Sequence, residues 1–370
     1  MIYLDNGATS FPKPREVVRA MVDAMASCAN PGRGGYPASM AGAQRVYSCR
    51  EQAADYFGCK PEQVVFTSGC THGLNIAIGS LFSKGDRVAI SGFEHNAVTR
   101  PLLLLGIEGI IAGRRLFDPA DTLQRWEDTL RSGVDGAVFT HVSNVFGYIL
   151  PVQEMAALCK AYGVPFIIDA AQSAGVLDVR LDRLGADFIA MPGHKGLLGP
   201  MGTGILLCGR EGKPLMAGGT GSESENQQMP PYLPDRLEPG TVNVPGIAGL
   251  EAGIRKVKQL GRERIHGREC AAAKRCIRML KEKGYTVFSG ADQTGVVSFL
   301  PREDCESFAE NLGRRGIAVR AGLHCAPLAH ESAGTLKSGT VRLSFGPDAS
   351  PVQVDLLRQA MESIEKRAGK

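Results

Sequence analysis

Long apolar runs and a strong net charge are both missing from this sequence. The leucine run Leu102–Leu105 is far shorter than the roughly 20 apolar residues that a membrane-spanning helix needs. The amino terminus has no charged region followed by an apolar one. The 42 basic and 38 acidic side chains leave a net charge of +4, which favours neither nucleic acid nor a membrane surface as a partner. We therefore expect a cytoplasmic protein that binds neither.

Paired cysteine motifs are missing as well. The ten cysteines are scattered without any CxxC spacing, which favours reduced thiols over a disulfide framework or a zinc site. We expect most of them to be small core residues, with no metal site. Glycine is abundant, with 46 residues, and its share exceeds the usual roughly 7%. It gathers after the apolar runs, where loops approach a ligand closely.

Short apolar segments, separated by helix-length stretches, organise the first part of the chain. Segments of this kind are typical of strands in a mostly parallel sheet that is covered by helices on both faces. They lie at residues 64–66, 88–90, 137–139, 166–168, 188–190 and 205–207. We therefore predict a large α/β domain over residues 14–245.

The pattern changes after the Pro/Gly-rich residues 238–249. Long helical stretches over residues 250–284 precede candidate strands in GVVSFLPR, GIAVRAG and TVRLSF, and a final helix has one apolar face. We predict a smaller α+β domain over residues 246–370, joined by the amino-terminal residues 1–13. The segment GGTGSESENQQMPP, residues 218–231, is expected to be a long loop.

Polar residues follow several of the predicted strands. Ligands of such sheets bind beyond the carboxyl ends of the strands. The residues found there are Ser68, Glu94, Asn144, Asp169 and His194. We expect the chemistry of the protein to converge at this edge of the sheet.

Lys195 and Asp169 are the most informative residues. Lys195 lies among glycines just after an apolar strand, a setting that suits a Schiff base with an aldehyde better than a salt bridge. Asp169 ends another apolar strand, where a carboxylate is costly unless it is paired, and a protonated pyridine would pair it. Together they suggest pyridoxal phosphate. A solvated lysine and a helix-capping aspartate are the simpler alternatives.

Three further features could serve the same cofactor. The segment Ser68–Thr71 lies between a strand and a helical stretch, so it offers backbone N–H groups and a hydroxyl to a phosphate. The His95 ring could stack on a cofactor ring, and the Asn144 amide could hydrogen-bond a phenolic oxygen. Taken singly, each has a simpler alternative: a capping turn, a structural histidine and an asparagine in a turn.

Eight motifs follow one another along the chain: TSGCTHGLN, EHNAV, HVSNVFG, IDAAQS, GHKG, EPGTVN, RAGLHC and VRLSF. In this order they resemble the class V aminotransferase family, specifically its cysteine desulfurases of the SufS-like type with a short cysteine loop, and the related selenocysteine lyases. The resemblance runs from Tyr3 almost to the carboxyl end. It implies the fold of type I pyridoxal phosphate enzymes, with a mostly parallel seven-stranded sheet, and a homodimer.

The resemblance also implies a cofactor site. It makes Lys195 the Schiff-base lysine, Asp169 the partner of the pyridine nitrogen, and His95 the stacking and catalytic ring. Phosphate would be bound by Thr71, by His194 and, from the other subunit, by Thr241. The further cofactor residues are Cys70, Asn144 and Gln172, the last two near the phenolic oxygen.

The same pattern implies the substrate and the reaction. Arg342 would hold the substrate carboxylate, a task suited to a guanidinium, and Arg320 and Asn144 would also line the substrate site. Cys325 would accept sulfur as a persulfide, with its thiol activated by His324 or by the bound substrate. L-cysteine would become L-alanine, and the sulfur would pass to an acceptor protein, as in iron–sulfur cluster assembly.

Two positions depart from the family pattern. Pro192 replaces a serine whose hydroxyl is expected to contact phosphate, and Leu323 replaces the first histidine of an HHC sequence. Phosphate binding would then depend more on Thr71 and His194, and proton transfer near the thiol would differ. Three alternatives stay open: a selenocysteine lyase; another lyase, epimerase or transaminase of the same fold; and a catalytically silent sulfur-transfer scaffold.

Overall fold

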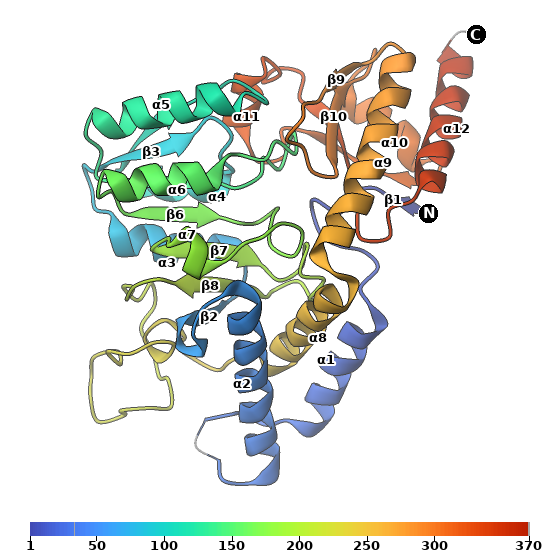
Figure 1. The fold of residues 1–370 in the computed structure, drawn as a ribbon. Helices are drawn as coiled ribbons and strands as arrows, with labels where there is room; N and C mark the ends of the chain where they lie inside the picture. Colours follow the sequence, from blue (N-terminus) through green and yellow to red (C-terminus); the bar gives the residue numbers. More distant parts are fainter. Residues whose placement is uncertain (33, 369–370) are drawn as a thin grey trace.

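A seven-stranded sheet forms the centre of the fold (Figure 1). The computed structural model describes residues 1–32 and 34–368. The strands of this sheet are β2 Val64–Thr67, β3 Arg87–Ser91, β4 Glu108–Ala112, β5 Gly136–Thr140, β6 Phe166–Asp169, β7 Phe188–Pro192 and β8 Gly204–Cys208. They stand in the order β2-β8-β7-β6-β5-β3-β4, and β8 runs opposite to the other six strands. The predicted α/β fold with a mostly parallel sheet is confirmed.

The sequence patterns indicated six of these strands and missed β4. This strand lies at the edge of the sheet beside β3. Its sequence EGIIA begins with a charged residue and a glycine, and Ala112 is its only buried residue. An edge strand that is half exposed does not need the continuous apolar run by which the central strands were found.

Helices cover both faces of this sheet. They are α1 Arg15–Ser27, α2 Pro37–Phe57, α3 Cys70–Leu81, α4 Asn96–Leu104, α5 Pro119–Arg131, α6 Val152–Ala161, α7 Leu181–Leu184 and α8 Val244–Leu260. Successive strand residues point to opposite faces. Val65 and Ile167 therefore pack in one apolar cluster with α3 and α4, while Phe66 and Ile168 pack in another with α2, α5 and α6.

A second, smaller sheet is antiparallel and has the order β12-β13-β10-β9. The strands of the carboxyl-terminal part are β9 Thr286–Phe288, β10 Val296–Leu300, β11 Ile317–Ala318, β12 Arg320–Gly322 and β13 Thr340–Ser344. Its helices are α9 Arg262–Glu282, α10 Cys305–Gly313, α11 Pro327–Ser332 and α12 Pro351–Ala368. Short 3₁₀ helices lie at Pro61–Gln63 and Asp235–Leu237.

The amino-terminal segment packs with this carboxyl-terminal part. Its strand β1, Ile2–Tyr3, pairs in parallel with β11, and Leu4 is buried in the same apolar cluster as residues of α9, α10 and α12.

The helical stretches expected over residues 250–284 are α8 and α9, which meet at Gly261, where φ is +78°. The domain bounds 14–245 and 246–370 stay a prediction, and residues 369 and 370 lie outside the described residues.

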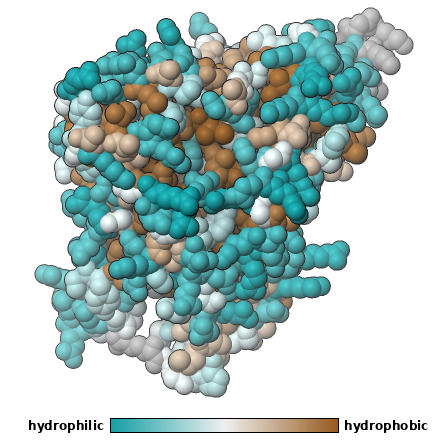
Figure 2. Space-filling model, viewed as in Figure 1, coloured by the Kyte–Doolittle hydropathy of each residue, from teal (hydrophilic) through white to brown (hydrophobic). Residues whose placement is uncertain are grey.

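The surface is largely polar on the face that Figure 2 shows, with apolar residues scattered mainly over its upper part. Among the described helices, none combines the length and the apolar character that crossing a membrane requires. The segment 218–231 has neither helix nor strand, as the loop prediction requires.

Candidate active site

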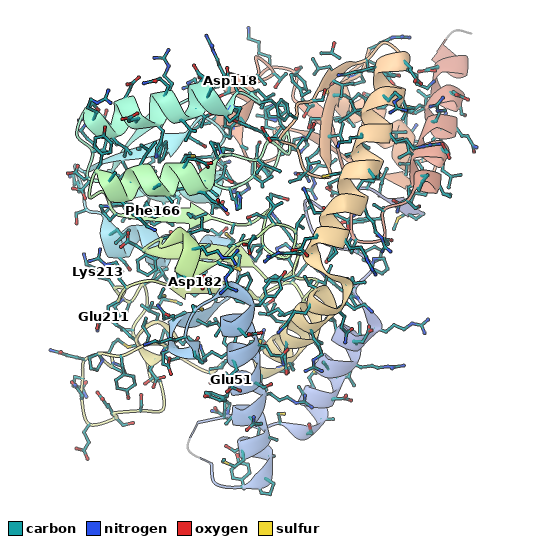
Figure 3. All side chains as sticks on the ribbon, in the orientation of Figure 1. Glu51, Asp118, Phe166, Asp182, Glu211 and Lys213 are labelled. Carbon is teal, nitrogen blue, oxygen red and sulfur yellow. The ribbon has the colours of Figure 1, made fainter. Side chains whose placement is uncertain are left out.

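One cavity of about 470 Å³ gathers nearly all of the residues expected in the site. It lies at the carboxyl ends of the parallel strands: in Figure 3, Phe166 marks the amino end of β6, and the strand runs from there to Asp169 on the cavity wall. The expected residues that line it are Cys70, Thr71, His95, Asn144, Asp169, Gln172, His194, Lys195, Arg320, Cys325 and Arg342.

Asp169 ends β6 as a buried carboxylate, with only 2% of its surface exposed. Its Oδ1 atom accepts a hydrogen bond from the backbone N–H of Ala171 at 2.8 Å and one from the thiol of Cys70 at 3.4 Å. Both donors are electrically neutral. The negative charge of Asp169 is thus oriented by the protein and left for a positively charged ligand atom to balance.

Lys195 lies in the loop after β7. Burial lowers the pKa of its ammonium group, and the positive charges of Arg342 and Arg320 add to this effect, while Asp169 opposes it. A lower pKa increases the share of neutral amine at physiological pH. The neutral amine is the form that attacks an aldehyde or accepts a proton.

His95 is fixed at the start of α4. Its Nδ1 atom accepts a hydrogen bond from the backbone N–H of Ala97 at 3.0 Å and so caps the helix. The hydrogen of the neutral ring therefore sits on Nε2. Burial lowers the pKa of His95, although Asp169 acts in the opposite direction. The cavity thus has a flat, neutral ring in a defined orientation.

The start of α3 offers hydrogen-bond donors to the cavity. The backbone N–H groups of Cys70 and Thr71 belong to the first turn of the helix, where they have no partner within it. His72 also lines the cavity, and its Nδ1 atom accepts a hydrogen bond from the Ser68 backbone N–H at 3.2 Å. His72 could not be predicted from the sequence, because a histidine inside a helical stretch carries no signal of its own.

His194 and Pro192 form another part of the wall. Burial lowers the pKa of His194 to about 4, and its buried Nδ1 atom has no hydrogen-bond partner within the described part of the chain. The His194 carbonyl accepts hydrogen bonds from the Ser10 backbone N–H at 3.0 Å and from Lys13 Nζ at 2.7 Å. Pro192 has no side-chain hydroxyl, so it offers no hydrogen bond to a ligand here.

The amides of Asn144 and Gln172 both have protein partners. Asn144 Nδ2 donates to the His324 carbonyl at 2.7 Å, and Gln172 Nε2 donates to the Gly7 carbonyl at 3.0 Å. Because an amide nitrogen carries two hydrogens, each side chain retains a second N–H that can donate a hydrogen bond to a ligand oxygen. Both amides are therefore held in place by the protein.

The arginines approach the cavity from the small sheet. Arg342, on β13, is 3% exposed and donates to the Asn144 carbonyl at 3.0 Å and to Asp5 Oδ1 at 2.8 Å. Arg320, on β12, donates from Nε to Asp5 Oδ2 at 3.1 Å. Asp5 could not be predicted as part of this group, since nothing in the amino-terminal sequence indicates that it lies beside residues more than 300 positions away.

Cys325 lies in a tight turn between β12 and α11. It is the only exposed cysteine among the ten, all of which are free. His324 and Cys325 have φ values of +49° and +57°, and this left-handed conformation costs a non-glycine residue roughly 1–2 kcal/mol. Hydrogen bonds hold the turn: the Cys325 carbonyl accepts from the Asn96 N–H at 2.7 Å, and the Ala326 N–H donates to the Leu323 carbonyl at 2.9 Å.

His324 does not supply the positive charge that would favour a Cys325 thiolate. Its imidazole is buried, with Nε2 at 3.2 Å from the Thr340 carbonyl and 3.3 Å from the Thr340 hydroxyl. Burial lowers the pKa of His324 to about 2, so the ring is neutral at physiological pH. The neutral ring brings no positive charge to the thiol, and the activation of Cys325 by His324 or by the bound substrate stays a prediction.

Thr241 and Glu94 do not line this cavity. Thr241 lines a neighbouring cavity of about 540 Å³, and Ser68 and His72 line both cavities. Glu94 is fully buried, and its Oε1 atom accepts hydrogen bonds from the Ser91 N–H at 3.3 Å and the Thr140 N–H at 2.9 Å. Burial raises the pKa of Glu94 to about 8. Glu94 therefore ties the ends of β3 and β5 together rather than facing a ligand.

Comparison with known proteins identifies relatives of the whole chain. A probable cysteine desulfurase of Methanothermobacter thermautotrophicus is 34% identical, over 98% of this chain and 94% of the relative. One of Pyrococcus abyssi is 33% identical, over 99% of this chain and 94% of the relative.

Solved structures have the same fold. The apo structure of the cysteine desulfurase from Thermococcus onnurineus NA1 matches with a TM-score of 0.91 and 33% identity, over 99% of this chain and 94% of that one. The cysteine desulfurase CsdA from Escherichia coli, at 24% identity, shares the fold with a TM-score of 0.86, over 98% of this chain and 94% of that one. The aminotransferase class-V family profile matches residues 2–357, and the chain belongs to this family.

Proposed function

We propose that this protein is a cysteine desulfurase, which uses pyridoxal phosphate to convert L-cysteine into L-alanine and accepts the sulfur on Cys325. One observation carries the proposal. The exposed thiol of Cys325 lies on the wall of a cavity that also contains Lys195, Asp169 and Arg342. The names of the relatives with 33–34% identity support the same activity.

The residues of the cavity fit pyridoxal phosphate, the cofactor on which enzymes of this family depend. Asp169 presents a buried carboxylate whose hydrogen-bond donors are neutral, which suits a protonated pyridine nitrogen. The first turn of α3, with Thr71, suits the phosphate. The Nδ1 atom of His194, which has no hydrogen-bond partner among residues 1–32 and 34–368, is available for a further polar contact. Lys195 suits the aldehyde, and the flat ring of His95 suits stacking.

When bound, this cofactor takes up the electrons that are released at the substrate α-carbon. The remaining tasks fall to the side chains of the protein. Arg342 holds the substrate carboxylate, and the neutral amine of Lys195 accepts the α-proton and later returns a proton to the product. The lowered pKa of Lys195 makes this neutral amine available.

Cys325 performs the sulfur transfer. Its thiolate attacks the substrate sulfur, so that an S–S bond forms while the Cβ–S bond breaks. The electron pair of the broken bond stays with the substrate carbon, which takes up a proton and becomes the methyl group of L-alanine. Cys325 is left as a persulfide. Its exposed position allows an acceptor thiol to remove the outer sulfur.

Mass spectrometry of the cofactor-loaded protein after addition of L-cysteine tests the proposal. We expect alanine to be released and a persulfide to form on Cys325, and Cys325→Ser to lose both while Cys270→Ser keeps them. Cys270 is a matched control because its thiol also has a histidine nearby, with Sγ 3.5 Å from His266 Nδ1. A persulfide on Cys70 or Cys305, or normal turnover of L-cysteine by Cys325→Ser, would contradict the proposal. Activity of that variant with L-selenocysteine alone would favour a selenocysteine lyase.

We also propose a homodimer in which Thr241 reaches the phosphate site of the partner subunit. The support is that Thr241 lines a separate cavity which shares Ser68 and His72 with the site. Mixed dimers of Lys195→Ala and Thr241→Ala subunits distinguish the two arrangements. If Thr241 acts across the interface, the mixed dimer has one intact site and regains activity. If it acts within its own subunit, both sites stay defective.

We propose a cytoplasmic location and an acceptor protein with a reactive thiol. The ten free cysteines support the location, because free thiols persist in reducing compartments. The exposed position of Cys325 supports the acceptor. Fractionation of the source cells tests the location. Transfer of label from ³⁵S-cysteine to a second protein tests the acceptor.

A further inference from the structure

Asp5 connects the two arginines of the substrate side. Its Oδ1 atom accepts a hydrogen bond from Arg342 at 2.8 Å, and its Oδ2 atom lies 3.1 Å from both Nε and Nη2 of Arg320. The Asp5 residue is 8% exposed. Both arginines line the cavity, whereas Asp5 does not. The carboxylate thus lies behind the arginines rather than in the ligand space.

The backbone holds Asp5 firmly in this place. Leu4, the residue before it, donates to the Ala318 carbonyl at 2.9 Å and accepts from the Ser344 N–H at 2.7 Å. Asp5 itself forms a parallel bridge with Ser344, and the Tyr3 hydroxyl donates to the Asp5 carbonyl at 3.1 Å. The amino-terminal segment is therefore hydrogen-bonded into the small part of the fold that carries both arginines.

Asp5, Arg320 and Arg342 together carry a net charge of one positive unit. Two guanidinium groups contribute two positive charges, and Asp5 contributes one negative charge. An α-amino acid with a neutral side chain brings one carboxylate to the arginines. A ligand with a second anionic group, such as L-aspartate, would bring two negative charges to a site that can balance one.

We propose that Asp5 is a specificity-determining residue, which limits the arginine pair to one unmatched positive charge and so favours amino acids with an uncharged side chain. This inference rests on the proposed function, because it takes the arginines to bind the substrate carboxylate. Asp5 acts through Arg320 and Arg342 and touches no ligand. Its removal therefore changes which ligand charge is preferred.

The test compares two ligands of nearly the same shape, L-asparagine and L-aspartate. Their affinities for the cofactor-loaded protein are measured by calorimetry, which needs no turnover. In Asp5→Asn we expect the affinity for L-aspartate to rise about tenfold relative to L-asparagine, because a unit charge within several ångströms has at least this effect near a protein surface. An unchanged ratio in a folded Asp5→Asn variant overturns the inference.

Three further variants separate charge from structure. Asp5→Glu keeps the charge and is expected to retain the parental ratio. Asp5→Asn combined with Arg320→Gln restores a single positive charge and is expected to return the ratio to the parental value, which a purely structural role of Asp5 would not do. Asp182→Asn is the matched control, since Asp182 accepts two hydrogen bonds from Arg180 outside the cavity.

If Asp5→Asn does not fold, the Arg320→Gln variant is tested in its place. It leaves Asp5 and Arg342 with no net charge, so the affinity is expected to fall about tenfold for L-asparagine and about 100-fold for L-aspartate, because L-aspartate carries one more negative charge. An unchanged ratio of the two affinities overturns the inference. Release of alanine from L-cysteine by the parent is assayed separately, so a failure of the proposed function would appear there and not in the ligand ratio.

Discussion

Replacing Gly196 by alanine is expected to displace Lys195 and slow the reaction. A Cβ atom at Gly196 would lie 2.3 Å from the backbone oxygen of Ala174 and 3.2 Å from a Val176 methyl group. Non-bonded atoms rest about 3.5 Å apart, so the two backbone segments would have to separate by roughly 1 Å. Such overpacking costs about 1–3 kcal/mol of stability, and a 1 Å displacement near the reacting atoms can lower a rate about 100-fold.

The rate of alanine release and the thermal unfolding of Gly196→Ala measure these two effects. Gly267→Ala is the control, because a Cβ atom at this position in α9 would meet nothing within 4 Å. Alanine in a helix interior is expected to stabilise this control by up to about 1 kcal/mol, with no change in rate. If Gly196→Ala kept the parental rate and stability, the close backbone contact would not position Lys195, and the reasoning would be refuted.

Three other substitutions follow from buried charges. Arg342→Gln is expected to raise KM for L-cysteine by roughly 30-fold or more, because breaking a buried charge pair costs about 2–5 kcal/mol; steady-state assays measure it. Glu269→Gln should unfold at a higher temperature than the parent at pH 8 but not at pH 4.5. Burial raises the pKa of Glu269 to about 8, so the Glu269 carboxyl lowers the parent's free energy of unfolding as pH rises from 4.5 to 8. His141→Gln should show the opposite dependence in the same assay: burial lowers the pKa of His141 to about 4, so the parent loses stability as pH falls from 6.5 to 4 and the variant loses less.

The central strands could be predicted because burial on both faces demands a continuous apolar run. Residues of β6, for example, are buried on either side of the sheet. The edge strand β4 could not be predicted in the same way, because it is covered only in part. Polar residues after the central strands were good candidates for the site, because parallel strands bring their carboxyl ends to one edge of the sheet.

The cavity brings together eleven of the residues that the resemblance implied, but the contacts between them could not be predicted. Asp5 meets Arg342 across more than 300 residues of chain, and no local pattern encodes such a pair. The left-handed turn at His324 and Cys325 could not be predicted either, because neither residue is a glycine, the residue that adopts this conformation without steric cost. Contacts with distant segments stabilise both features.

Asn144 connects the two sides of the cavity. It follows β5 of the large sheet, while its carbonyl accepts from Arg342 of the small sheet and its amide donates to the carbonyl of His324. Asn96, at the start of α4, donates in turn to the carbonyl of Cys325. The substrate arginine and the sulfur-accepting turn are therefore both hydrogen-bonded to the large sheet's side of the cavity. A shift between the two sheets would have to break these bonds, so the contacts that orient Arg342 also help to hold the Cys325 turn in place.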